Sequence, residues 1–149
     1  MTTTSHCRCG KSGVEISGEP LLRFICHCTL CQAFNKAPVA DVVVYRKKDV
    51  ALTPGTDLQY QQMRKPPAVN RGTCKACGQP FAEFMHLPLI SDIAFVPAEL
   101  LPPDSLPEPA MRLFYDSRVA DATDGLPRHE GYLASQFAVM RRLLPRLLY

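Results

Sequence analysis

Short apolar stretches separated by glycine, proline and polar residues recur along most of the chain and predict a mainly β protein. The clearest stretch, residues 38–45, contains four valines and favours the β conformation. Other strands are expected at residues 14–16, 21–25, 50–53, 58–63, 81–86, 90–96 and 111–115. Irregular structure is expected at residues 1–5, 65–67 and 121–130, and at residues 97–109, which hold five prolines.

The end of the sequence has the spacing of a helix instead. Between residues 132 and 144, four apolar side chains fall on one helical face: Leu133, Phe137, Met140 and Leu144. Pro145 is expected to end or kink this helix. We therefore divide the chain into a β domain over residues 1–131 and a helical extension over residues 132–149 that packs on it. A homodimer contact between two copies of the chain is the alternative use of the apolar face.

Length and composition fit one globular domain with a hydrophobic core. The chain has 149 residues, of which 46% are hydrophobic, and no apolar run is long enough to span a membrane. No secretory signal is recognisable, and seven cysteines exclude a fully paired disulfide framework. We therefore expect a cytoplasmic protein whose thiols are reduced.

The cysteines fall into three groups. Residues 26–31 read Cys-His-Cys-Thr-Leu-Cys, and the flanking groups read Cys-Arg-Cys-Gly at 7–10 and Cys-Lys-Ala-Cys-Gly at 74–78. A Cys-x-Cys pair in an extended segment places both sulfurs on one face, and residues 29–34 suit one helical turn carrying the third thiol. Glycine after a ligand suits a turn with positive φ. Convergent thiolates of this kind indicate Zn²⁺ binding.

Seven ligands divide most simply into four and three. One set makes a closed structural zinc site that joins two segments distant in sequence: Cys7, Cys9, Cys74 and Cys77. The other set leaves one position of a zinc ion open, as in catalytic sites: Cys26, Cys28 and Cys31. The alternative is that a protein side chain closes this second site, and the candidates are His27, His6, His86 and Asp92. His27 is the least suited, because its side chain points away from both sulfurs in an extended Cys-His-Cys segment.

Metal binding changes the meaning of the net charge. The formal charge of +3 treats every cysteine as neutral, whereas four thiolates on one Zn²⁺ contribute −2 and three on another contribute −1, so the total falls to zero. We therefore expect neither nucleic acid nor a membrane as a partner. Near an open zinc, candidate acids or bases are His27, His86 and His129. A further hypothesis is a redox sensor, in which residues 26–31 form a disulfide when the metal leaves.

The order Cys-x-Cys-Gly, Cys-His-Cys-x-x-Cys and Cys-x-x-Cys-Gly, from about Cys7 to Val96, resembles the glutathione-dependent formaldehyde-activating enzyme family, which includes centromere protein V. The resemblance implies a β-tent fold of small twisted antiparallel sheets stapled by zinc. It also implies a structural zinc on Cys7, Cys9, Cys74 and Cys77, and a labile catalytic zinc on Cys26, Cys28 and Cys31. This division agrees with the one reached from ligand counting.

The activity implied by the resemblance is that of S-(hydroxymethyl)glutathione synthase, a carbon–sulfur lyase-type enzyme. A small thiol such as glutathione would bind the open zinc, and its thiolate would add to an aldehyde such as formaldehyde. The alternative function is a non-catalytic interaction module stapled by two structural zinc ions.

Overall fold

Two β-sheets form the framework of the structure, a computed structural model that describes residues 2–64 and 69–148. The smaller sheet has the order β1-β2-β5, made of β1 (Thr3–His6), β2 (Gly13–Ile16) and β5 (Val50–Leu52). The larger sheet has the order β10-β3-β4-β9-β8-β7-β6, made of β10 (Arg112–Leu113), β3 (Leu22–Cys26), β4 (Ala40–Arg46), β9 (Ile93–Pro97), β8 (Pro80–Met85), β7 (Val69–Cys74) and β6 (Leu58–Gln61). Neighbouring strands are antiparallel except β10 and β3, which run parallel.

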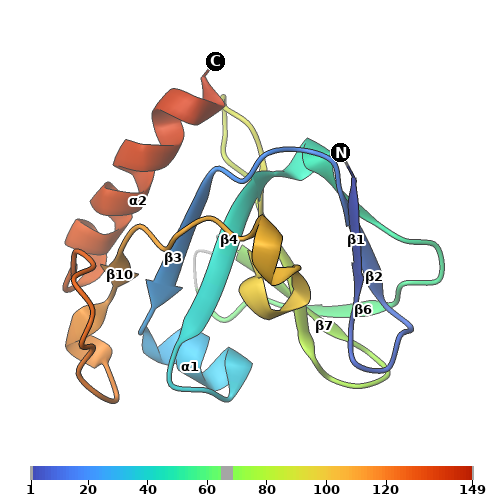
Figure 1. Cartoon of the computed structure of the whole chain (residues 1–149), viewed down its shortest axis with the longest axis horizontal. Coiled ribbons are helices and arrows are strands. Elements are labelled where there is room, and N and C mark those ends of the chain that lie inside the picture. The colour runs from blue at the N-terminus through green and yellow to red at the C-terminus, as the bar shows by residue number, and fades with distance from the viewer. Residues whose placement is uncertain (1, 65–68, 149) are drawn as a thin grey trace.

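Two α-helices accompany the sheets. α1 (Thr29–Asn35) follows β3, and α2 (Tyr132–Leu147) lies near the C-terminus; short 3₁₀ turns are η1 (Lys47–Asp49), η2 (Ala98–Leu100), η3 (Pro103–Ser105) and η4 (Tyr115–Ser117). Figure 1 shows α2 along one flank beside β10 and β3, the β1–β2 hairpin on the opposite side, and α1 at one end of β3. The expected mainly β fold with a C-terminal helix is confirmed.

The side chains of β4 alternate between two hydrophobic cores. Val43 and Tyr45 pack in a core that includes two cysteines of the first and third sequence groups. Val42 and Val44 pack in a second core, which includes two cysteines of residues 26–31. Burial on both faces explains the uninterrupted run of valines, because a strand covered on one side alone would alternate with polar residues. Each buried valine contributes about 1.5–3 kcal/mol.

The expectation of a loose end at residues 1–5 was wrong, because Thr3–His6 forms β1 and pairs with β2. No strand was expected at Val69–Cys74, yet these residues form β7 between β6 and β8. β7 contains Asn70 and Gly72, which disfavour strands, and β1 has two strand-favouring threonines but only four residues, so pairing with neighbouring strands determines the conformation of both. The loop expected at residues 65–67 lies outside the described residues.

Helix α2 exists as expected, but a different face packs on the sheet. Its buried residues are Ser135, Ala138 and Leu143, whereas Leu133 and Phe137 are 80% and 69% exposed. The small side chains allow close approach, and the Ser135 hydroxyl accepts a hydrogen bond of 2.9 Å from the Phe114 N–H. A contact between two copies through the exposed face stays a prediction.

Pro145 does not end the helix, which was one of the two effects expected of it. α2 continues to Leu147, and the Leu148 N–H still bonds the Leu144 carbonyl at 3.1 Å. The proline lies in the last turn, where its missing N–H removes one hydrogen bond only. Arg146 fastens this end to the sheet through a bond of 2.6 Å to the Leu21 carbonyl.

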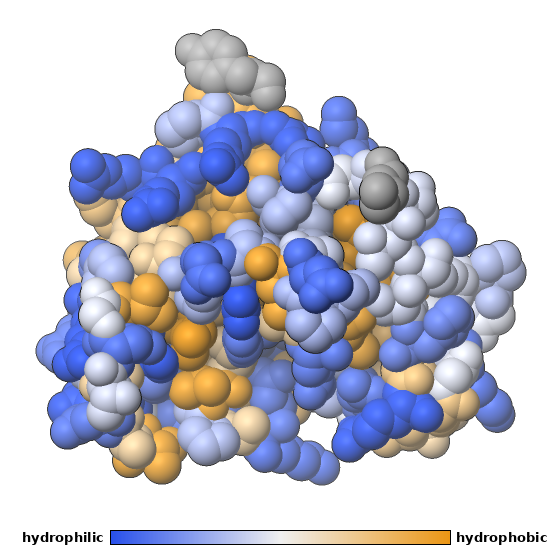
Figure 2. Space-filling view, in the orientation of Figure 1, coloured by the Kyte–Doolittle hydropathy of each residue, from blue (hydrophilic) through white to orange (hydrophobic). Residues whose placement is uncertain are grey.

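The outer surface is mixed in polarity. Figure 2 shows hydrophilic side chains over most of one face, with apolar side chains visible in several separate areas between them. Among the described residues, no helix has the length and apolar character needed to cross a membrane.

Truncating one side chain on each face of α2 tests which face packs on the sheet. Leu143→Ala should lower the free energy of unfolding by about 2–5 kcal/mol, because Leu143 is fully buried. Leu133→Ala should change it by less than about 0.5 kcal/mol. Urea unfolding of both variants measures the difference, and equal effects would contradict the packing described above.

Candidate metal centres

Four cysteines converge where the two sheets meet. Cys7 and Cys9 lie in the turn between β1 and β2, Cys74 is the last residue of β7, and Cys77 lies in the turn between β7 and β8. The Cys7 sulfur is 3.4 Å from that of Cys9 and 3.6 Å from that of Cys74, and the Cys9 and Cys74 sulfurs are 3.7 Å apart. We call these residues the four-cysteine group; it links the smaller sheet to the larger one.

The dimensions of the four-cysteine group suit zinc. Sulfurs at the corners of a tetrahedron with Zn–S distances of about 2.3 Å are about 3.8 Å apart. Ser12 donates to the group twice, from its N–H to Cys7 at 3.4 Å and from its hydroxyl to Cys74 at 3.2 Å. Gly10 and Gly78 have φ of 79° and 75°, as expected for the turns that follow the ligands.

The second cluster, the three-cysteine group, is built at one end of β3. Cys26 is the last residue of β3, Cys28 is the N-cap of α1, and Cys31 lies in its first turn. The Cys28 sulfur accepts a hydrogen bond from the Cys31 N–H at 3.2 Å. The three sulfurs lie within 4.8 Å of one another, so a strand end and a helix start bring together the ligands that the sequence predicted.

The parallel strand β10 positions the segment that carries these thiols. The His27 N–H donates to the Leu113 carbonyl at 2.9 Å, and the buried His27 ring packs edge-on against Tyr115. Its Nε2 is 3.0 Å from Nη1 of Arg112. Burial, followed by the charge of Arg112, lowers the pKa of His27, so this ring is neutral at pH 7 and accepts a hydrogen bond from the guanidinium.

None of the four alternative ligands joins the three-cysteine group among the described residues. The His27 ring contacts Arg112 and Tyr115, and the ring Nδ1 of His86 is 2.6 Å from a carboxylate oxygen of Asp92. His6 is exposed in β1, beside Gly13. The donor set therefore consists of three sulfurs, one fewer than a closed tetrahedral site requires.

Three sulfurs at this separation cannot all be negatively charged without a cation. Hydrogen bonds from Cys26 and Cys31 are the main causes that lower the pKa of Cys28. The hydrogen bond to Cys28 is the main cause that raises the pKa of Cys26. Ionisation of one thiol thus disfavours ionisation of its neighbours, and a bound divalent cation would stabilise all three thiolates together.

Sequence reasoning missed an ion pair beside the three-cysteine group. Nη1 of Arg71 lies 3.8 Å from the Cys31 sulfur and 3.5 Å from a carboxylate oxygen of Glu83. Burial raises the pKa of Glu83 to about 7, although the charge of Arg71 acts in the opposite direction. The available signal was a lone acid inside the apolar strand at 81–86, because a buried carboxylate needs a partner.

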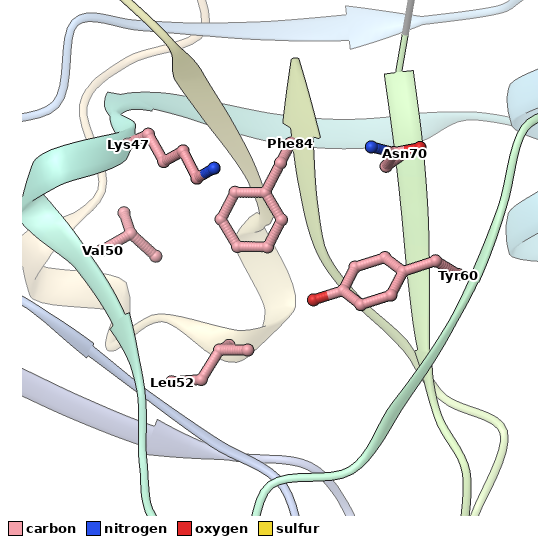
Figure 3. A pocket seen from close by; sticks show the side chains of 6 residues that line it. All are labelled: Lys47, Val50, Leu52, Tyr60, Asn70 and Phe84. Carbon is pink, nitrogen blue, oxygen red and sulfur yellow. The ribbon is translucent and has the colours of Figure 1, made fainter. Parts of the chain in front are cut away.

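One hollow of the described surface lies away from the thiols. It has a volume of about 610 Å³ and is lined by Lys47, Val50, Leu52, Tyr60, Asn70 and Phe84 (Figure 3). Asn70 and Phe84 are paired across β7 and β8, and so are the adjacent residues Arg71 and Glu83. Because successive side chains of a strand point to opposite faces, Asn70 and Phe84 lie on one face of the sheet, and Arg71 and Glu83 lie on the other. The hollow is therefore on the other face of the sheet from the three-cysteine group.

Fold and sites together define a mainly β protein with two cysteine clusters that could each hold a metal ion. A family model described as glutathione-dependent formaldehyde-activating enzyme matches residues 2–117. The chain belongs to this family, and α2 lies beyond the matched region.

Other comparisons concern the fold alone. The structure is similar to the crystal structure of a Rhodobacter sphaeroides protein, with a TM-score of 0.54 and 20% sequence identity, over 72% of this chain and 97% of that one. No curated protein matches the sequence.

Metal content tests the division into two groups. We expect two zinc ions per chain in the native protein and one in Cys28→Ser, because this substitution removes one ligand of the three-cysteine group and leaves the four-cysteine group intact. Atomic absorption on the dialysed proteins measures this. A native protein with one zinc, or a Cys28→Ser variant with two, would contradict the assignment.

Proposed function

We propose that the chain is a zinc-dependent enzyme of the carbon–sulfur lyase type, in which the three-cysteine group holds the catalytic metal. The substrate pair is a small thiol, such as glutathione, and an aldehyde, such as formaldehyde. The observation that carries the proposal is the set of three convergent sulfurs with no fourth protein ligand beside them among the described residues. Membership of the family supports the choice of glutathione and formaldehyde.

The reaction is an addition with no change of oxidation state. A bond forms between the thiol sulfur and the aldehyde carbon, the carbonyl π bond breaks, and the thiol proton is transferred to the former carbonyl oxygen. Zinc on three thiolates would supply a Lewis-acid position that favours the thiolate form of an incoming thiol near neutral pH.

The protein side chains prepare the position for this chemistry. Cys28 is fixed by its hydrogen bond from α1, and Cys26 by the end of β3, so the backbone of these two elements positions both sulfurs. The backbone N–H of His27 bonds β10, and the ring Nε2 of His27 contacts Arg112. Because the ring is engaged by Arg112, this proposal gives it no part in proton transfer at the sulfurs. His86 is exposed, pairs with Asp92 and does not belong to the three-cysteine group, so this proposal assigns neither His27 nor His86 as the acid or base.

The four-cysteine group has the other role in this proposal. It joins segments 65 to 67 residues apart in the sequence and takes two hydrogen bonds from Ser12. A closed site of this kind stabilises the folded state, by about 10 kcal/mol or more in small zinc domains. We assign it a structural zinc.

Cobalt(II) substitution tests thiol binding directly. On addition of glutathione, the cobalt protein should gain sulfur-to-metal charge-transfer absorption, because a fourth sulfur enters the coordination sphere. S-methylglutathione is the matched control and should produce no such change. A spectrum that is unaffected by glutathione at millimolar concentration would refute the proposal.

Two cysteine variants distinguish an enzyme from an interaction module with two structural metals. Cys74→Ser should lose most of the folded population, whereas Cys28→Ser should keep the fold within about 1–2 kcal/mol and lose the addition reaction. Thermal unfolding and the consumption of formaldehyde with glutathione measure the two effects. Equal destabilisation by both substitutions would favour the interaction module.

A further inference from the structure

The Arg71–Glu83 pair is unusual in this chain because both charges are buried. The two side chains are 12% and 11% exposed, and Glu83 is the one buried carboxylate among the described residues. Removing two charges from water is expensive, and apolar residues of similar size often give equal or greater stability. A pair in this place therefore indicates a need for charge beyond that of folding.

Three contacts place the guanidinium of Arg71 beside the thiols. Nη1 lies 3.5 Å from the Glu83 carboxylate and 3.8 Å from the Cys31 sulfur, and the guanidinium carbon is 5.6 Å from the centre of the Phe34 ring. Phe34 follows Cys31 by one turn of α1, so the helix that carries the ligand also supports the arginine. Arg71 therefore interacts with the thiols from a fixed position.

The backbone of β7 determines the direction of the Arg71 side chain. Arg71 and Glu83 are paired across β7 and β8, and the register shifts directly afterwards, between Arg71 and Thr73. Gly72 lies at the shift, where a Cβ atom would be 2.7 Å from the Ala82 carbonyl oxygen. The strands can approach only with glycine at this position, so the irregularity that ends the regular pairing also sets the direction of Arg71.

The charge count of the site shows what Arg71 can do. Three thiolates and one Zn²⁺ carry a net charge of −1, and a thiol that binds as a thiolate makes it −2. Arg71 brings one positive charge to 3.8 Å from the Cys31 sulfur, and a guanidinium stays charged at any pH the protein experiences. Glu83 lies 3.5 Å from the same nitrogen, but burial raises the pKa of its carboxyl to about 7, so near neutral pH it offsets this charge only in part. Water is largely excluded here, so this charge is less screened than one at the surface.

We propose that Arg71 is the charge-compensating, positioning residue of the three-cysteine group, which favours both metal retention and entry of an anionic thiolate, and that Glu83 and Phe34 hold it in place. The part that concerns the incoming thiolate rests on the proposed function. The part that concerns metal retention does not, because the three thiolates belong to this chain.

The test compares Arg71→Gln with Arg71→Lys and with Arg23→Gln in the full chain loaded with metal. Gln removes the charge but still offers Glu83 a hydrogen bond, and Lys restores the charge. Arg23 is the matched control, because it forms an ion pair of 2.8 Å with Asp41 and is 17% exposed, and its guanidinium donates to Asp41 and the Pro107 carbonyl. Zinc transfer to a chromophoric chelator gives metal affinity, and glutathione titration of the cobalt protein gives thiol affinity.

We expect Arg71→Gln to weaken zinc binding at one of the two sites, and glutathione binding, by roughly 10- to 100-fold each, the range typical of groups that support metal ligands. Arg71→Lys should recover most of both losses, and Arg23→Gln should change neither. Affinities of Arg71→Gln within twofold of the native values, in a protein with native circular dichroism, would overturn the inference.

A second variant covers the case in which Arg71→Gln does not fold. Arg71→Met combined with Glu83→Leu replaces the whole pair by apolar side chains, which is often neutral for stability. The folded double variant should show the same losses of metal and glutathione affinity, and native affinities in it would overturn the inference. If the native protein itself binds no glutathione, the proposed function fails, while the zinc-transfer comparison still decides the role of Arg71.

Discussion

Close approach of anionic sulfur atoms is the constraint on which the structure depends. In the four-cysteine group, sulfurs from segments far apart in sequence lie 3.4 to 3.7 Å from one another. Thiolates at that distance repel unless a cation lies between them. The group lies between the β1–β2 turn and the β7–β8 turn, so the same cation would hold the smaller sheet against the larger one. Sheet pairing and metal chemistry are therefore coupled in this fold.

The two cysteine groups answer this constraint in different ways. The four-cysteine group brings sufficient sulfur for a closed site and is supported by hydrogen bonds from Ser12. The three-cysteine group stops one ligand short, and the nearby side chains that could complete it are turned elsewhere, as the contact of His27 with Arg112 shows. The positively charged side chain of Arg71 lies beside it instead. This difference supports different roles for two sites made of the same residue type.

The sequence was informative where chemistry is local. The grouping of all seven cysteines and the strands around the valine run followed from spacing and composition, because ligand turns and β-branched residues carry their own signal. β7 was missed because Asn70 and Gly72 disfavour a strand, and β1 because it is only four residues long; pairing with neighbouring strands determines the conformation of both. Arg71 was missed for the same reason: its neighbour Glu83 is 12 residues away and becomes adjacent only through the register of β7 and β8. The packing face of α2 was also missed, because the buried Ser135 is polar and the buried Ala138 is small, and neither belongs to the pattern of large apolar residues at 132–144.

The side chains of β4 alternate between two cores, so this one strand packs against both cysteine groups. Its odd and even positions each face a different cluster of thiols, as Val43 and Val44 show. A single inserted or deleted residue within β4 would exchange the two faces and disturb both metal environments together. Both metal environments therefore depend on an unchanged length of this one strand.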